Sequence, residues 1–298
     1  MINMKRRNWW KLGWLPVLLV CMAATTQAAS PSAVEMRRSF EVADIERTRR
    51  VAVHIYIPTS VTRRSSILVV MHGNGRNAEN YHEVWQPIAS ANGAILVTPE
   101  FSKDEWPRSR HYHQGNIQTV RNATKPWNVW SFTAMEKAVE IAAGVAGVSG
   151  KKFYLYGHSA GAQFVHRYVM VTGGARLIRA VAANAGWYSW PSKTKAYPYG
   201  VALIDNHRWD WKTVFRTGLT ILVGADDNDP EAKSLRRSAK VMFQGEHRLA
   251  RGSGFFRAAR ALADTSGAAF HWRFATVPNV GHSNHDMAKA AARILFPQ

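Results

Sequence analysis

Ser159 stands in the motif Gly157-His158-Ser159-Ala160-Gly161, and it is the residue whose surroundings most favour chemistry. The spacing Gly-x-Ser-x-Gly is typical of a sharp turn between a strand and a helix, where glycines remove side chains that would collide with neighbouring backbone. The apolar run 153–156 before it predicts a strand, and the segment 160–171 after it predicts a helix. The N-terminus of such a helix stabilises an oxyanion. The motif therefore predicts a nucleophilic serine, with an ordinary glycine-rich turn as the alternative.

A serine hydroxyl needs a neighbouring base, and that base needs a carboxylate to orient it. Both follow in the chain, each just beyond an apolar run that predicts a strand: Asp227 as the acid and His282 as the base. Asp226 and Asp229 lie equally near the end of their strand, and only the Gly-x-x-Asp spacing favours Asp227, so Asp229 remains open. His285, three residues further along, is the alternative base.

The elements that must position these residues follow from the pattern of apolar runs. The segments 39–42 and 50–58 predict an antiparallel pair at a sheet edge, and continuous apolar runs predict buried strands at 67–71, 94–99, 152–157, 179–184, 219–224 and 270–277. Helices are predicted at 77–91, with an interruption near Pro87, and at 131–146, 160–171, 251–264 and 285–295. Alternating strands and helices indicate βαβ units, so we expect an α/β fold with a mostly parallel central sheet flanked by helices.

Two aromatic and basic stretches, 101–130 and 187–216, interrupt this alternation and predict insertions over the active-site edge of the sheet. Four of their aromatic residues are candidates for the substrate pocket: Trp106, Tyr112, Trp187 and Tyr188. Basic residues interleaved with them predict a cleft that is aromatic and cationic: Arg108, Arg110, Arg121, Lys125, Lys193, Lys195 and Arg208. Such a cleft suits an aryl or hydrophobic ester, or an ester on an anionic polymer.

Several motifs together resemble one known family. They are His72-Gly73-Asn74-Gly75, Trp106-Pro-Arg with Tyr112, Gly157-His-Ser159-Ala-Gly161, Gly224-x-x-Asp227 and Val280-Gly281-His282. The chain resembles the α/β-hydrolase superfamily, and within it the secreted polyhydroxybutyrate depolymerases and feruloyl esterases. The resemblance implies an α/β-hydrolase fold and a serine hydrolase that cleaves carboxylic esters through an acyl-enzyme, with Ser159 as nucleophile, Asp227 as acid and His282 as base. Those families often pair cysteines, whereas this sequence has one cysteine, Cys21.

The oxyanion hole is expected from backbone N–H groups, which leave no side-chain pattern. We expect the N–H of Ala160, directly after the nucleophile, and that of Asn74 in the glycine-rich loop. The same loop supports an alternative, because Gly73-Asn-Gly75 after a strand, with Glu100 downstream, fits an NAD(P)-dependent oxidoreductase. A second alternative is a non-catalytic envelope-binding protein on a hydrolase fold.

The N-terminus predicts export. Basic residues Lys5, Arg6, Arg7 and Lys11 precede an apolar run and then small residues, which is the order of a signal peptide over 1–28. A single catalytic domain would then span 29–298, in the periplasm or outside the cell. A lipoprotein reading at Cys21 is the alternative.

Charge and composition constrain the partners. The formal net charge of the 298 residues is +19, and loss of the four basic residues of the predicted signal peptide lowers it to +15. So basic a surface attracts polyanions. We expect a small or polymeric ester substrate, either neutral or anionic. We expect no nucleic acid partner and no stable membrane anchor. No cofactor or metal is expected, since His111-x-His113 lacks a third ligand and predicts two solvated loop histidines. The oligomeric state is left open.

Overall fold

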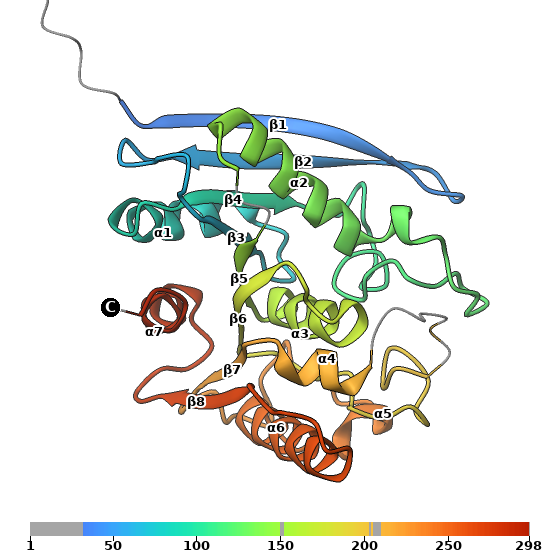
Figure 1. Ribbon diagram of the computed structural model, residues 1–298. Coiled ribbons are helices and arrows are strands. Elements are labelled where there is room, and N and C mark those ends of the chain that lie inside the picture. Colours follow the sequence, from blue (N-terminus) through green and yellow to red (C-terminus); the bar gives the residue numbers. More distant parts are fainter. Residues whose placement is uncertain (1–31, 150–151, 203, 205–209, 298) are drawn as a thin grey trace, which may run out of the picture. The chain divides into compact units, whose positions relative to one another are not determined.

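Eight strands form the central sheet of the computed structural model, which describes residues 32–149, 152–202, 204 and 210–297 (Figure 1). The strands are β1 (Val34–Ala43), β2 (Thr48–Ile57), β3 (Ile67–Met71), β4 (Ile95–Glu100), β5 (Phe153–His158), β6 (Leu177–Ala183), β7 (Leu219–Gly224) and β8 (Arg273–Val277). They are ordered β1-β2-β4-β3-β5-β6-β7-β8. β2 is antiparallel to β1 and β4, whereas β4, β3, β5, β6, β7 and β8 are parallel, so their carboxyl ends share one edge.

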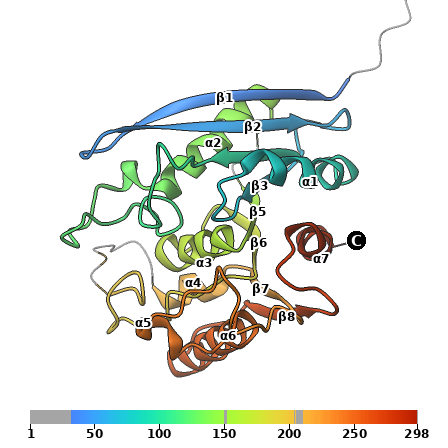
Figure 2. The same cartoon turned by 180° about the vertical axis from the view of Figure 1, so that it is seen from behind.

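Helices cover both faces of this sheet. They are α1 (Ala78–Ala91), α2 (Ser131–Ala146), α3 (Ala160–Thr172), α4 (Trp211–Arg216), α5 (Ala239–Met242), α6 (Arg248–Thr265), α7 (Asn284–Leu295) and the 3₁₀ helix η1 (Trp127–Val129). Trp85 of α1 and Met287 of α7 pack in the core of one face. Phe132 of α2, Phe164 of α3 and Phe255 of α6 pack in the core of the other. Figures 1 and 2 show these two helical layers on opposite sides of the sheet.

The inner strands are buried because their sequences are continuously apolar. Every residue of β3 and of β7 is buried, as expected of strands that have helices on both faces. The edge strand β1 is mostly exposed and carries charged side chains instead. The predicted antiparallel pair and the predicted mostly parallel sheet are thereby confirmed.

The expected helices differ from the structure in two details. Helix α1 is continuous through Pro87, although an interruption was predicted there: the residues on both sides of the proline are helical. The short helices α4 and α5 were not predicted, since one or two turns are too short to show a helical repeat. The predicted signal peptide, with Cys21, and Arg208 lie outside the described residues. None of the helices in the described ranges combines the length and hydropathy needed to cross a membrane.

A buried charged cluster fastens the first insertion to the turn between β1 and β2. Lys125 Nζ donates to Asp44 Oδ2 at 2.8 Å, and both side chains are 0% exposed. Arg49 and Asn116 also donate to Asp44, at 3.4 and 2.9 Å. Lys125 therefore neutralises a core carboxylate, and the prediction that it lines a cationic cleft is wrong. Removing either charge would take the nearest opposite charge from the buried partner.

Candidate active site

The turn between β5 and α3 presents Ser159 at the shared carboxyl edge of the parallel strands. Ser159 has φ 57° and ψ −112°, a left-handed conformation that a non-glycine residue adopts only where its surroundings enforce it. Its N–H donates to the carbonyl oxygen of Ala183 at 2.9 Å, which holds the turn against β6. A Cβ at Gly161 would lie 2.1 Å from the carbonyl oxygen of Met71. Glycine is therefore required for α3 to begin so close to β3.

Two loops at the same edge bring the acid and the base to the serine. Asp227 follows β7 and His282 follows β8. The His282 Nε2 atom lies 3.1 Å from Ser159 Oγ, and His282 Nδ1 lies 2.7 Å from Asp227 Oδ2. The Asp227 side chain is 4% exposed and that of His282 is 28% exposed, so the acid is enclosed while the imidazole reaches solvent. Asp227, and not the alternative acid Asp229, therefore contacts His282.

The sequence positions these two loops through a close backbone contact. A Cβ at Gly224 would lie 2.2 Å from the carbonyl oxygen of Val280, so only glycine lets the loop after β8 approach the end of β7. The Asp226 N–H donates to that same carbonyl oxygen at 3.0 Å. This contact explains the Gly-x-x-Asp spacing, because it sets Asp227 opposite His282. His285, the alternative base, lies in the first turn of α7 and contacts Asp286 at 3.2 Å.

Asn184 is hydrogen-bonded to both the loop after β7 and the loop after β8, and no sequence motif predicted this role. Its Oδ1 accepts from the Gly224 N–H at 2.8 Å, and its Nδ2 donates to the Gly281 carbonyl oxygen at 3.0 Å. Asn184 is fully buried and has φ 54°, a conformation that asparagine tolerates better than most residues. Its position at the end of the predicted strand 179–184 was the available clue, but nothing in the chain indicated its two partners.

His158, the residue before the serine, packs against His282 with ring centroids 4.6 Å apart. Burial, followed by the neighbouring His282 and Arg248, holds the pKa of His158 well below its ordinary value. The Tyr81 hydroxyl oxygen lies 3.1 Å from His158 Nδ1, within hydrogen-bond distance. His158 is therefore a neutral ring beside the candidate base, and it adds no positive charge that would oppose protonation of His282.

The loop after β3 lies directly beside the serine. A Cβ at Gly73 would be 3.9 Å from the Cβ of Ser159. The next residue, Asn74, is exposed, and Ala160 is buried as the first residue of α3. The Tyr112 hydroxyl supports the loop from below, since it donates to the His72 carbonyl oxygen at 2.6 Å. The two backbone segments expected to form the oxyanion hole thus flank the candidate nucleophile.

Three of the four predicted pocket residues are core residues. Trp106, Tyr112 and Tyr188 are 0% exposed, so they offer no surface to a substrate, and the prediction that they line the pocket is wrong. Each instead supports a loop or a helix: Trp106 donates to the Arg50 carbonyl oxygen, and Tyr188 stacks on Phe255 at 4.4 Å. Large aromatic side chains bury much apolar surface, which explains why these insertions pack onto the sheet.

Trp187, the fourth predicted pocket residue, is 3% exposed and lies between two arginines. The guanidinium carbon of Arg167 is 4.2 Å from its ring centroid and that of Arg236 is 5.3 Å away. Arg236 also donates to the Tyr199 hydroxyl at 2.9 Å, and Lys240 lies 5.5 Å from the Tyr199 ring. Within the part of the chain that the structure describes, no carboxylate pairs with Arg236 or Lys240. Two exposed cations on an aromatic base are therefore available to an anionic ligand.

Buried arginines join the loops around the site through backbone carbonyl oxygens. Their guanidinium groups donate as follows: Arg76 to Phe101 and Trp106, Arg167 to His113 and Gln163, and Arg251 to Gly186 and Gly245. Burial is the largest cause that lowers the pKa of Arg167 and of Arg251 to about 10. The groups remain cationic near neutral pH, so these links persist there.

The pair His111 and His113 does not form a metal site in the described ranges, which hold no cluster of three or more His, Cys, Asp or Glu side chains suited to a metal. Both rings are 4% exposed, so the prediction of solvated loop histidines is wrong. His111 Nε2 contacts Glu46 at 3.1 Å, and His113 Nδ1 accepts from Arg167 at 3.1 Å. Their role in the insertion is structural.

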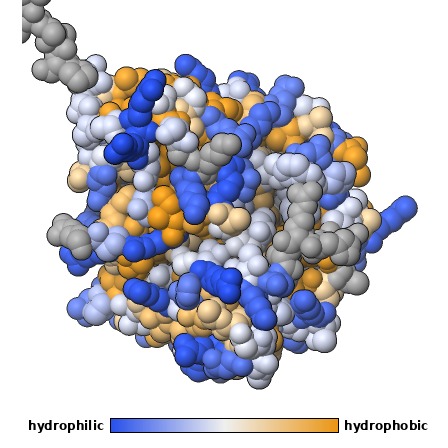
Figure 3. All heavy atoms as spheres, viewed as in Figure 1, coloured by the Kyte–Doolittle hydropathy of each residue, from blue (hydrophilic) through white to orange (hydrophobic). Residues whose placement is uncertain are grey.

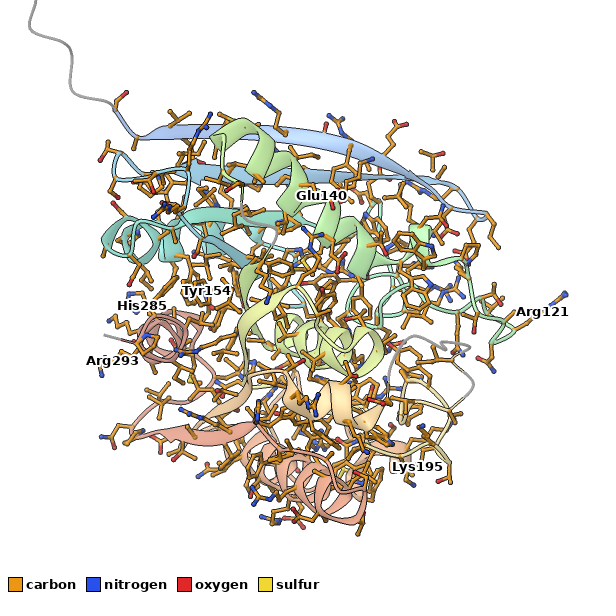
Figure 4. All side chains as sticks on the ribbon, viewed as in Figure 1. Arg121, Glu140, Tyr154, Lys195, His285 and Arg293 are labelled. Carbon is orange, nitrogen blue, oxygen red and sulfur yellow. The ribbon has the colours of Figure 1, made fainter. Side chains whose placement is uncertain are left out.

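Basic side chains from both insertions reach solvent. Figure 3 shows strongly hydrophilic residues distributed over the face with α2. In Figure 4, Arg121 from the first insertion and Lys195 from the second both extend outward on the same side of the view. The exposed cations of this region thus come from separate segments of the chain.

Solved structures similar to this chain include two bacterial polymer hydrolases. Poly(aspartic acid) hydrolase-1 from Sphingomonas sp. KT-1 is 36% identical, with a TM-score of 0.82 over 89% of this chain and 99% of that chain. The poly(3-hydroxybutyrate) depolymerase from Bordetella parapertussis is 28% identical, with a TM-score of 0.82 over 89% of each chain. S-formylglutathione hydrolase from Staphylococcus aureus shares the fold at 11% identity and a TM-score of 0.55, over 89% of this chain and 98% of that chain. No family model matches the sequence, and no curated protein does.

Proposed function

This chain belongs to the α/β-hydrolase superfamily as a serine ester hydrolase, and from that premise we propose that Ser159, His282 and Asp227 are its catalytic triad. The observation that carries the proposal is the continuous chain of contacts from Ser159 Oγ through His282 to Asp227, at 3.1 and 2.7 Å. The proposed reaction is cleavage of a carboxylic ester through an acyl-enzyme. Neither the oxidoreductase nor the non-catalytic binding protein accounts for these two contacts among three residues.

In the proposed mechanism His282 Nε2 takes the proton of Ser159 Oγ as the oxygen attacks the ester carbonyl. Asp227 fixes the imidazole tautomer and stabilises the imidazolium. The N–H groups of Ala160 and Asn74 stabilise the oxyanion, supported by the positive end of the α3 dipole. His282 then protonates the leaving alcohol, and a water molecule activated by the same ring hydrolyses the acyl-enzyme.

The proposed substrate carries negative charge. The formal charge of the chain is +19, and Arg236 and Lys240 lie exposed on the Trp187 and Tyr199 aromatic pair in the loop region after β6. An anionic polymer or an ester on an anionic carrier would bind such a surface. One specific observation favours a second linkage: the relative at 36% identity is a poly(aspartic acid) hydrolase, and poly(aspartic acid) is a carboxylate-bearing polyamide. The same acyl transfer chemistry cleaves an amide, so an anionic polyamide is the second candidate.

Covalent labelling of the nucleophile with a fluorophosphonate tests the proposed triad. We expect a fluorophosphonate to modify the purified protein with a stoichiometry of about one, because the reagent traps the activated serine of an acyl-transfer site. Mass spectrometry of a digest should place the adduct on Ser159, and His282→Ala should label far more slowly. An adduct on another residue, or none, contradicts the proposed nucleophile.

The salt dependence of ester hydrolysis tests the proposed charge of the substrate. Raising the salt concentration to about 0.3 M shortens the screening length to about 5–6 Å. We expect the apparent KM for a polyanionic ester to rise about tenfold from low salt to that concentration, because screening weakens capture. The kcat/KM of a small neutral ester should change less than about twofold.

Neighbouring arginines provide the control for this prediction. Arg236→Gln should weaken the salt response, whereas Arg237→Gln should leave it nearly intact, because the charge of Arg237 is paired with Glu231 at 3.3 Å. An equal salt response for the charged and neutral esters would remove the proposal of electrostatic capture and leave the triad untouched.

We also propose that the protein is exported, with the signal peptide over 1–28 removed. The basic, apolar and small-residue order of that segment supports the proposal. In the periplasm or outside the cell the enzyme would meet anionic envelope polymers or external polymers. N-terminal sequencing of the protein from the culture fractions tests it, and a mature chain that begins at Ala29 is the expected result.

A further inference from the structure

Asp227 has a second charged partner that the ester hydrolase mechanism does not require. Arg248 Nη1 donates to Asp227 Oδ1 at 2.9 Å, while His282 occupies the opposite oxygen, Oδ2. The side chains of Arg248 and Asp227 are 2% and 4% exposed. Arg248 Nη2 also donates to Ser234 Oγ at 2.7 Å, and the Leu249 N–H donates to the Asp227 carbonyl oxygen at 3.2 Å. The carboxylate is thus held from both sides.

The position of Arg248 is unfavourable apart from this contact. It is the first residue of α6, where the positive end of the helix dipole disfavours a cation. Burial of a guanidinium costs further free energy, and Arg248 Nε has no hydrogen-bond partner among the described residues. The contact with Asp227 offsets these costs, so the chain places a cation beside the proposed catalytic acid against its local preferences.

We propose that Arg248 is a positioning residue that fixes the Asp227 carboxylate toward His282 and, through its positive charge, extends the activity of the enzyme to lower pH. This inference rests on the proposed triad. The two contacts prevent rotation of the carboxylate, so Oδ2 stays aimed at His282 Nδ1. The guanidinium also lies 2.9 Å from the carboxylate, so its positive charge partly offsets the stabilisation that Asp227 gives to an imidazolium at His282.

The remaining titratable groups near His282 come from the loops and helices packed around it. They are His158 at the end of β5, Asp226 and Asp229 after β7, Tyr188 after β6, Arg251 on α6, and His285 with Asp286 on α7. His158 is neutral, as described above. Asp226, Asp229, His285 and Asp286 are exposed, so solvent screens them. Arg251 donates to two carbonyl oxygens, whereas Arg248 donates directly to the acid. Arg248 is therefore the buried charge in direct contact with Asp227.

The test is the pH profile of kcat/KM for a small neutral ester, with active enzyme counted by fluorophosphonate titration. We expect Arg248→Gln to move the acid limb upward by about one pH unit and to lower kcat/KM at neutral pH about 10- to 100-fold. Arg248→Lys keeps the charge and loses the forked geometry, so we expect a lower kcat with the acid limb within about 0.3 pH unit of wild type. Arg251→Gln is the matched control, because it removes a buried arginine of the same helix without touching Asp227.

The outcomes separate the inference from the proposed function. An unmoved acid limb in Arg248→Gln, with a loss of stability like that of Arg251→Gln, would overturn the inference and leave a purely structural arginine. If Arg248→Gln does not fold, a wild-type acid limb in Arg248→Lys with a lowered kcat supports the inference, and an acid limb displaced by one unit despite the retained charge overturns it. Failure of Ser159 to react with the fluorophosphonate would instead reject the triad itself.

Discussion

Replacement of Ser159 by alanine is expected to lower ester turnover by about five to six orders of magnitude while the fold and substrate binding persist. The serine supplies the attacking oxygen, so nothing in the site can form the acyl-enzyme without it. His282→Ala should fall to a similar residual rate, and the double variant should fall no further, because triad members act as a unit. Turnover of a chromogenic ester and the circular dichroism of each variant measure the two effects.

The chain offers matched controls for this prediction. His285→Ala changes an exposed histidine that contacts Asp286, so its turnover should stay within about twofold of wild type. Asp229→Asn should be equally mild, whereas Asp227→Asn should be severe, because Asp227 contacts His282. Loss of turnover in His285→Ala with near-normal turnover in His282→Ala would contradict the assignment of the base.

Mild acid should unfold this protein because many of its histidines are buried in the neutral form. Burial is the largest cause in each case: it lowers the pKa of His72 to about 3, and it holds the pKa of His113, His158 and His166 well below the ordinary value. In the unfolded chain each has a pKa of about 6.5. Between the folded and unfolded pKa values the unfolded state binds more protons, so the free energy of unfolding falls as the pH falls below about 6.5.

The expected size of this effect exceeds that of most single substitutions. Each such histidine lowers the free energy of unfolding by up to about 1.4 kcal/mol per pH unit, so four together lower it by up to about 5.6 kcal/mol per unit. A domain stable by about 5–15 kcal/mol should therefore lose its fold between about pH 6 and pH 4. Thermal unfolding followed by circular dichroism at pH 7.5, 6.5, 5.5 and 4.5 measures it. The exposed His271 gives a control, since His271→Gln should leave the slope unchanged. A Tm that is constant from pH 6.5 to 5 would disprove the prediction.

The part of the fold that follows from short-range pattern was predictable. The runs 67–71 and 219–224 are almost entirely apolar, with Thr220 as the exception, and became β3 and β7 with the expected bounds, since burial on both faces favours apolar side chains. Helix α2 also has its predicted bounds, 131–146. The motif around Ser159 could be predicted because a tight turn requires its glycines. The glycine before Asp227 could be predicted because a close approach of two backbone segments requires it.

The rest depends on contacts between segments far apart in the chain. Arg248 and Asp227 are separated by 20 intervening residues, and no spacing indicates that a surface-type residue will be buried beside an acid. Lys125 shows the same problem, because its charge predicts exposure while its partner Asp44 lies in a distant turn. Aromatic residues such as Tyr112 are equally ambiguous, since their composition fits a pocket wall or a core and only the packing decides.

The arginine-to-carbonyl links around the active site have a consequence for where this enzyme can work. Secreted proteins commonly fasten such loops with disulfides, whose formation requires an oxidising compartment and whose reduction loosens them. Here the sole cysteine is Cys21, and the loops are joined by Arg76, Arg167 and Arg251 instead. A guanidinium bound to a carbonyl oxygen is indifferent to thiols. The described residues contain no cysteine, so their fold needs no disulfide, and a change in the redox state of the surroundings is not expected to alter the geometry of the site.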